Sequence, residues 1–290
     1  MQLLINMLNT ASVLVLIEIS FYLIFQVAKF FHIAHAVTIT LGAFLTYQFS
    51  VGYGFSLEFA IPTAICAVVL INISIELGIY KPLRKKKTSS WMMLISSLGL
   101  YVILQNLVSI IWGDGTKSIR TWPVRAGHSF CGAHITNVQI LVISVSVLVF
   151  VSTMLFLHYT RFGKQIRAVA SNVELSRIFG ISSDKVIFLS FVFGSAIGAL
   201  SGILIALDLD MNPTMGFHIF LYAVVAMIVG GLGSYVGLVG GALLLSIALH
   251  ISTYFLSGEW MDATAFFILI LFLIWKPLGF SGKRLKKVEI

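Results

Sequence analysis

Apolar runs long enough to form helices fill most of this sequence. They lie at 3–28, 32–50, 57–80, 91–112, 137–159, 186–207, 217–230, 235–256 and 261–276. A helix needs about 20 apolar residues to cross the hydrocarbon core. Only 10% of the residues are charged, against about 25% in a soluble domain. The sequence therefore predicts an all-α, polytopic membrane bundle of eight or nine passes, forming one domain over 1–290. The second, seventh and ninth runs are expected to be broken, tilted or re-entrant.

Clustered basic residues predict the orientation of these passes. Three segments, 81–87, 160–185 and the tail 276–290, hold 15 of the 19 Lys and Arg residues. Two apolar runs separate the first cluster from the second, and four separate the second from the tail, so all three fall on one face. The positive-inside rule makes that face cytoplasmic, and the loop at about 113–136 then faces outward. The net charge of +8 is explained by this topology and by attraction to anionic lipid, and it requires no nucleic acid.

Regularly spaced glycines predict close helix packing. Two sets recur at every fourth residue: Gly194, Gly198 and Gly202, then Gly233, Gly237 and Gly241. This spacing puts small residues on one helix face, where two backbones approach closely in lipid. A phosphate-binding loop is excluded because no GxxxxGK[ST] motif occurs. The stretch GGLGS at 230–234 also predicts a helix break, which either serves packing or marks a translocation path.

A few polar residues interrupt the apolar runs. Glu18 lies in the middle of the first run, and an ionisable group there marks either a functional site or a hydrogen bond that holds helices together. His32, His35, Thr38 and Gly42 lie together in FFHIAHAVTITLGAF. Their polar atoms either line a path for a small solute or are satisfied by neighbouring helices. Glu76, beside Lys81 and Arg84, is interpreted as one half of an interfacial ion pair.

No residue pattern indicates an enzyme or a metal centre. Nucleophile–histidine sets and paired carboxylates are missing from the sequence. His128, Cys131 and His134 have a ligand-like spacing, but three residues without a fourth partner do not predict a metal site. We therefore expect neither a metal ion nor any other cofactor in this chain.

The segment 160–185 is the one long polar interruption. Ser171 and Glu174 have the spacing of a capping box, in which the Ser side chain holds an amide of the first turn. Gly180 supplies the left-handed residue that commonly ends a helix. A two-turn helix at 172–179 is thus predicted, with Leu175, Ile178 and Phe179 on one side, preceded by a second amphipathic piece at 164–170. So short a helix is marginal alone, so we expect it to dock on the bundle, on lipid or on a soluble partner.

This segment resembles the cytoplasmic loop of ABC-importer permeases, where a short helix reads Glu-Ala-Ala followed by Gly. Glu174 and Gly180 match that pattern, while Leu175 and Ser176 replace the alanines. More specifically, RAVASNVELSRIFGI, NPTMGF, GGLGSYVGLVGG and KPLGFSGK are similar to segments of LivH-type permeases, which serve importers of branched-chain amino acids or urea. Near the N-terminus His35, Leu41, Gly42 and Ala43 match, whereas His32 and Ala36 replace the usual Asn and Gly.

The resemblance implies a set of partners. They are a second permease subunit, identical or different, two cytoplasmic ATPases that bind ATP and Mg, and an extracytoplasmic substrate-binding protein. The chain would lie in the bacterial inner membrane. The residues expected to couple it to the ATPases are Arg167, Ser171, Glu174, Leu175, Arg177, Ile178, Phe179 and Gly180. The candidates for the translocation path are Glu18, His32, His35, Thr38, Gly42, Pro213, Gly216, Gly230, Gly231 and Gly233.

The implied function is import of leucine, isoleucine, valine or a related small solute such as urea. Two other interpretations remain open from the residues themselves. One is a secondary transporter driven by an ion gradient, with Glu18 as the coupling residue. The other is a membrane scaffold without a transport role.

Overall fold

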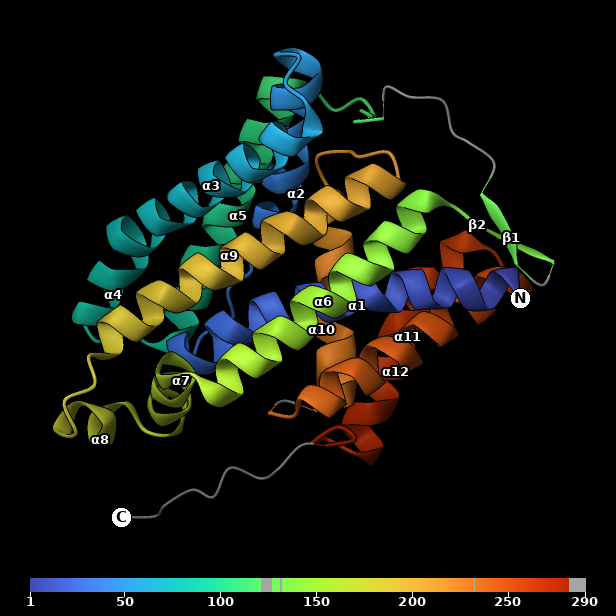
Figure 1. Ribbon diagram of the computed structural model, residues 1–290. Coiled ribbons are helices and arrows are strands. Elements are labelled where there is room, and N and C mark those ends of the chain that lie inside the picture. The colour runs from blue at the N-terminus through green and yellow to red at the C-terminus, as the bar shows by residue number, and fades with distance from the viewer. Residues whose placement is uncertain (121–126, 131, 232, 282–290) are drawn as a thin grey trace. The chain divides into compact units, whose positions relative to one another are not determined.

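The computed structural model describes residues 1–120, 127–130, 132–231 and 233–281, which are predominantly helical (Figure 1). Seven helices in these ranges are long and apolar enough to cross a membrane, which confirms the predicted all-α polytopic class. The elements are α1 (Gln2–Ala28), α2 (His35–Tyr47), η1 (Gln48–Gly52), α3 (Leu57–Ile75), η2 (Glu76–Tyr80), α4 (Lys81–Lys85), α5 (Ser90–Trp112), β1 (His128–Phe130), β2 (Ala133–Ile135), α6 (Asn137–Tyr159), α7 (Arg161–Ser171), α8 (Val173–Ile178), α9 (Ser183–Asp208), α10 (Met215–Gly230), α11 (Tyr235–Phe255), η3 (Gly258–Trp260) and α12 (Met261–Trp275).

Three of the apolar runs form shorter helices. The helix α2 has 13 residues and continues into the π-helical turn η1, α10 has 16, and α12 has 15 after the 3₁₀ turn η3. At 1.5 Å per residue, α10 is about 24 Å long, less than the ~30 Å of a hydrocarbon core. These are the runs predicted to be broken, tilted or re-entrant. The total of eight or nine passes stays a prediction.

The chain divides into two compact units built from alternating segments. Unit 1 comprises Met1–Glu18, Arg125–Ser146 and Ile219–Ile290, and unit 2 comprises Ile19–Val124 and Val147–His218. Three of the boundaries fall inside α1, α6 and α10. Continuous helices therefore connect the units at those points.

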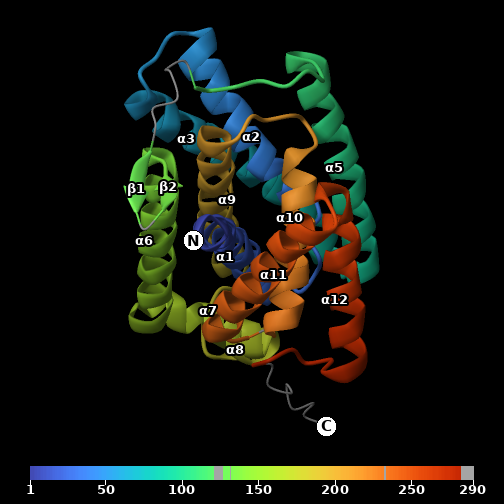
Figure 2. The same ribbon diagram turned by 90° about the vertical axis from the view of Figure 1, so that its right-hand side faces the viewer.

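In unit 2 the helices α2, α3 and α9 pack together (Figure 2). A Cβ atom added at Gly42 would collide with the Ala199 carbonyl, and one at Gly202 would collide with the Ile39 carbonyl. The two backbones are thus in direct contact where α2 crosses α9, which a larger residue at either glycine would prevent. Fully buried aromatic side chains, among them Phe44 and Phe191, complete this core.

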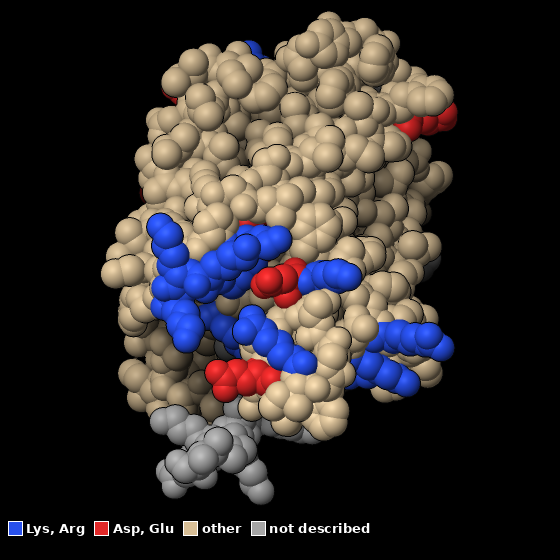
Figure 3. Space-filling view, turned by 90° about the vertical axis from the view of Figure 1, so that its left-hand side faces the viewer, with Lys and Arg blue, Asp and Glu red and all other residues tan. Residues whose placement is uncertain are grey.

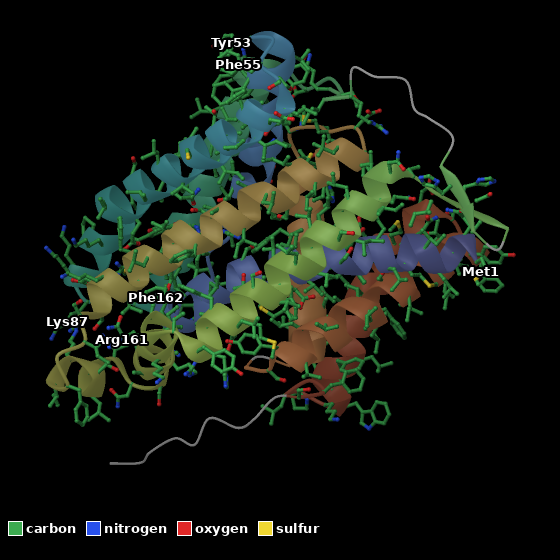
Figure 4. All side chains as sticks on the ribbon, in the orientation of Figure 1. Met1, Tyr53, Phe55, Lys87, Arg161 and Phe162 are labelled. Carbon is green, nitrogen blue, oxygen red and sulfur yellow. The ribbon has the colours of Figure 1, made fainter. Side chains whose placement is uncertain are left out.

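Basic side chains gather at one end of unit 2, over α4, α7 and α8 (Figure 3). Lys87 and Arg161 mark this end, whereas Tyr53 and Phe55 lie at the opposite end (Figure 4). The first two basic clusters therefore lie together, as counting the apolar runs predicted. In the third cluster, Lys276 is described, and Lys283, Arg284, Lys286 and Lys287 lie outside the described residues.

In unit 1 the helices α10 and α11 cross with their backbones in contact. A Cβ atom at Gly241 would collide with the Ala226 carbonyl, and one at Gly230 with the Gly237 carbonyl. The segment after α12 returns to the end of α10, where the Phe280 amide donates a hydrogen bond of 3.0 Å to the Val229 carbonyl. This contact satisfies a carbonyl that the helix end would otherwise leave unpaired.

The start of α1 forms hydrogen bonds with other elements of unit 1. The hydroxyl of Ser246 donates to the Met7 carbonyl at 2.7 Å. The antiparallel strands β1 and β2 form a hairpin, and the His134 amide in β2 donates to Oε1 of Gln2 at 2.8 Å.

Candidate functional site

The polar segment predicted between two spans forms the short helix α8, but its N-cap is not Ser171. Asn172 is the N-cap, because its backbone is extended (φ −152°, ψ 114°) and its side-chain oxygen accepts from the Leu175 amide at 3.0 Å. Ser171 is instead the last residue of α7. The predicted capping box was therefore wrong by one residue. Asn and Ser are equally good N-caps, so the backbone at the α7–α8 junction decides between them.

The end of α8 agrees with the prediction. Gly180 has φ +78°, a conformation that glycine adopts without steric cost. The amide of Gly180 donates to the Arg177 carbonyl at 3.0 Å, and the Ile181 amide donates to the Ser176 carbonyl at 2.9 Å. These two hydrogen bonds form a Schellman motif. The helix is consequently held in shape at both ends.

The apolar side of α8 is exposed on unit 2. Leu175 is 50% exposed, Ile178 is 80% exposed and Phe179 is 75% exposed. Ser176, on the other side, is buried. Among the docking surfaces left open by the sequence, the described helices of unit 2 are therefore not what these side chains pack against. Burying each of these side chains would contribute roughly 1.5–3 kcal/mol.

Two arginines of this segment attach α7 and α8 to the long helices. Arg167 donates hydrogen bonds to the carbonyls of Leu157 and His158 at the end of α6. Arg177 donates from Nε to the Ser183 hydroxyl at 3.0 Å, at the start of α9. Glu174 lies in the first turn of α8, where a negative charge is favourable. These charged side chains support the helix, while the apolar ones remain available to a partner.

Two buried histidines organise a polar cluster in unit 2. His35 Nε2 lies 2.8 Å from the Ser20 hydroxyl of α1. His32 Nδ1 lies 3.2 Å from the Ser97 hydroxyl of α5 and 3.0 Å from the Tyr80 hydroxyl of η2. The two imidazole centroids are 5.8 Å apart. Helices distant in sequence thus meet at this pair, which the sequence predicted only as one polar stretch.

Thr38 belongs to a neighbouring contact on α2. Its hydroxyl donates to Oδ1 of Asn72 at 3.2 Å, and Nδ2 of Asn72 donates to the Val68 carbonyl at 3.0 Å within α3. Both partners are buried. The Thr38 hydroxyl is therefore paired with a residue of the neighbouring helix α3. This agrees with the second of the two interpretations that the sequence left open.

Glu18 is 1% exposed. Within the described part of the chain, neither of its carboxylate oxygens has a hydrogen-bond partner. A buried carboxyl without a partner is costly in a membrane-spanning helix. This arrangement does not support the interpretation that Glu18 holds helices together by a hydrogen bond, and Glu18 stays a candidate for the translocation path.

The glycines divide between helix crossings and turns. Gly194 lies against α1, where an added Cβ would come within 2.8 Å of the Ser20 carbonyl oxygen, and Gly198 lies against His35 at 3.0 Å. Gly216, in the first turn of α10 and shortly after the buried Pro213, lies against the Ala36 carbonyl. Gly42, Gly216 and Gly230 are therefore packing positions, whatever else they contribute.

The predicted break in GGLGS is present between α10 and α11. Gly231 has φ +99° and Gly233 has φ +106°, values that require glycine. Gly237, in the first turn of α11, donates its amide to the Ser234 cap at 3.2 Å. The two helices on either side of this break cross at their glycines.

The histidines with ligand-like spacing lie on the hairpin of unit 1. His128 is in β1 and His134 is in β2, and Cys131 lies outside the described residues. No group of three or more potential ligands suited to a metal ion occurs within the described ranges.

Comparisons with known proteins identify the family. A family model described as the permease component of branched-chain amino acid transport systems matches residues 3–274. The chain belongs to this permease family. The *Escherichia coli* K12 protein LivH is 30% identical over 98% of this chain and 96% of its own length. BraD of *Pseudomonas aeruginosa* is also 30% identical, with the same coverage. Both are named as permease proteins of high-affinity branched-chain amino acid transport systems.

A solved structure shares the fold of this permease. PsaBC from *Streptococcus pneumoniae*, in complex with Fab, matches with a TM-score of 0.51 and 12% identity, over 96% of this chain and 93% of that chain. At this identity the likeness concerns the fold alone. The membership of a permease family shows that the chain is a transport subunit and not an enzyme.

Several buried residues of the permease escaped the sequence prediction. Ser20, Tyr80 and Ser97 contact the two histidines, and Asn72 contacts Thr38. Ser20, Ser97 and Asn72 are polar residues within apolar runs, and Tyr80 ends such a run just before Lys81, which is the available signal in the sequence. The ion pair expected at Glu76 is present: Nη1 and Nη2 of Arg84 donate to its two carboxylate oxygens.

Proposed function

We propose that this permease is the membrane subunit of an ATP-driven importer of branched-chain amino acids, and that α8 is the site where its ATPase binds. The exposure of Leu175, Ile178 and Phe179 on a helix capped at both ends carries this proposal. A helix that presents apolar anchors in this way suits a hydrophobic groove on a partner. The names of LivH and BraD support the substrate class.

The complete importer contains further chains. Two ATPases bind ATP and Mg, since this sequence has no phosphate-binding loop of its own. A second permease subunit, identical or different, completes the pore. A substrate-binding protein delivers leucine, isoleucine or valine to the end of the pore opposite α8.

The basic end of unit 2 faces the cytoplasm in this proposal. The clusters at 81–87 and 160–185 lie together there, and Lys and Arg accumulate in cytoplasmic loops. The chain then lies in the bacterial inner membrane with α8 exposed to the ATPase. The loop at about 113–136 faces the binding protein.

Co-purification tests the role of α8. The double variant Ile178→Ala/Phe179→Ala should reduce the amount of ATPase recovered with the tagged permease by at least tenfold, because two anchors of roughly 1.5–3 kcal/mol each are lost. The matched control is Ile110→Ala/Ile111→Ala, which removes side chains that are 77% and 64% exposed on α5. Equal recovery of ATPase with both double variants would refute the assignment.

Transport by the reconstituted complex tests the substrate and the energy source. Labelled leucine should enter proteoliposomes only when ATP and the binding protein are supplied, and urea should not compete. Uptake that persists without ATP and stops when an ion gradient is collapsed would instead indicate a secondary transporter. In that case Glu18→Gln would abolish uptake.

A further inference from the structure

An apolar cavity of about 210 Å³ lies within unit 2, between α1, α6, α7 and α9. The rings of Phe156, Phe162 and Phe193 form a triangle in its wall, with centroid distances of 5.9, 5.2 and 5.7 Å. Leu23 and Ile197 add aliphatic surface. An apolar cavity of ~150 Å³ holds a benzene ring. This cavity therefore has room for several methylene groups.

Exposed apolar side chains flank the cavity. Phe193, which lines it, is 39% exposed, and Leu189, one turn earlier on α9, is 37% exposed. On α6, Leu155 is 50% exposed beside Phe156. A ligand that reaches the cavity past these side chains must itself be apolar at the end that enters.

Cationic side chains stand next to the cavity on α7. Phe162 and Ile166 line the cavity, while Arg161 and Lys164, on the same helix, are exposed. Arg161 and Phe162 lie at the basic end of unit 2 (Figure 4). Residues three apart on a helix are neighbours, so Arg161 and Lys164 can engage one anionic group. An apolar cavity beside paired cations matches an amphiphile with an anionic head.

We propose that this cavity binds an acyl chain of an anionic phospholipid, whose headgroup phosphate contacts Arg161 and Lys164. Phosphate is a strong acceptor for Arg and Lys, and basic residues near the cytoplasmic surface attract anionic lipids. A second copy of this chain offers poor charge complementarity to these cations, because its net charge is +8.

Bound lipid would also hold α7 in place. Asn172 alone separates α7 from α8, so a displacement of α7 also moves the start of α8. The lipid then favours ATPase binding, a consequence that depends on the function proposed above for α8.

Lipid retention by the purified permease alone tests the site. Delipidated protein in detergent is titrated with dioleoyl phosphatidylglycerol or dioleoyl phosphatidylcholine, and binding is followed by native mass spectrometry and by Tm. We expect one phosphatidylglycerol per chain, retained preferentially, together with a rise in Tm. Equal retention of the two lipids would overturn the proposal.

Substitutions distinguish a specific lipid site from nonspecific electrostatic attraction of anionic lipid to the basic end of unit 2. Arg161→Gln/Lys164→Gln should weaken phosphatidylglycerol binding by roughly tenfold, whereas Lys85→Gln/Lys86→Gln, the same charge change on exposed residues at the same end, should not. Ile197→Phe fills the cavity and should abolish the preference without lowering the lipid-free Tm. Equal effects of the two charge variants, or full lipid retention by Ile197→Phe, would refute the site.

A dimer of the lipid-free permease that Ile197→Phe dissociates would also refute the lipid site, because a second copy of the chain would then cover the cavity.

Co-purification tests the consequence for α8 separately. More ATPase should be recovered in detergent with phosphatidylglycerol than with phosphatidylcholine, and Ile197→Phe should remove the difference. Equal recovery would overturn the link between lipid and α8. The lipid measurements contain no ATPase. If they show no preference for phosphatidylglycerol, the proposed function of α8 is unaffected.

Discussion

The Tyr80 hydroxyl lies 3.0 Å from Nδ1 of His32, with both side chains fully buried. Tyr80 ends the π-helical turn η2, and such turns are frequent at functional sites. The contact joins the segment between α1 and α2 to the end of η2, which continues α3. It places His32 within a hydrogen-bonded group.

Tyr80→Phe should lower the stability of the permease by about 1–2 kcal/mol, because the hydroxyl is lost while its buried partner remains. Thermal unfolding of the purified protein measures this change as a lower Tm. Tyr159→Phe is the matched control, since Tyr159 is 73% exposed. An unchanged Tm for Tyr80→Phe would show that this hydrogen bond contributes little.

Gly202→Ala should prevent the packing of α9 on α2. The added Cβ meets the Ile39 backbone, which cannot move as a flexible side chain can. We expect loss of the monodisperse peak in fluorescence-detected size-exclusion chromatography. Gly240→Ala is the control, because a Cβ there meets open space, and its profile should match the wild type. A monodisperse Gly202→Ala protein with an unchanged Tm would contradict the crossing.

Gly180→Ala should weaken ATPase co-purification by distorting the end of α8. A left-handed conformation costs an L-residue roughly 1–2 kcal/mol, and Asn tolerates it better than most residues. Gly180→Asn should therefore retain more ATPase than Gly180→Ala. The reverse order would indicate that the backbone conformation of Gly180 is unimportant for the partner.

Arg84→Ala should destabilise the permease by roughly 3–5 kcal/mol, because it leaves the buried Glu76 carboxylate unpaired. Glu76 is 1% exposed, and Arg84 binds it through Nη1 and Nη2. The double variant Glu76→Gln/Arg84→Ala removes the orphaned charge and should recover part of the lost Tm. A double variant less stable than Arg84→Ala would disprove this explanation.

The prediction of the α7–α8 segment shows how far local patterns reach. The stop at Gly180 was predicted because a helix end depends on a few neighbouring residues. The start was misplaced by one residue because Ser171 and Asn172 can both cap a helix. Asn172 takes the role where α7 ends and the backbone becomes extended.

Hydrophobic run length and charge spacing determined the membrane class and the position of the basic insert, because these properties depend on neighbours along the chain. Tertiary structure alone decided that His35 meets Ser20, that His32 meets Ser97 and Tyr80, and that Leu175, Ile178 and Phe179 remain exposed. Those outcomes depend on how each helix is rotated and where it crosses its neighbours. Both the rotation of a helix and its crossing points are determined by side-chain packing between segments that lie far apart in the sequence.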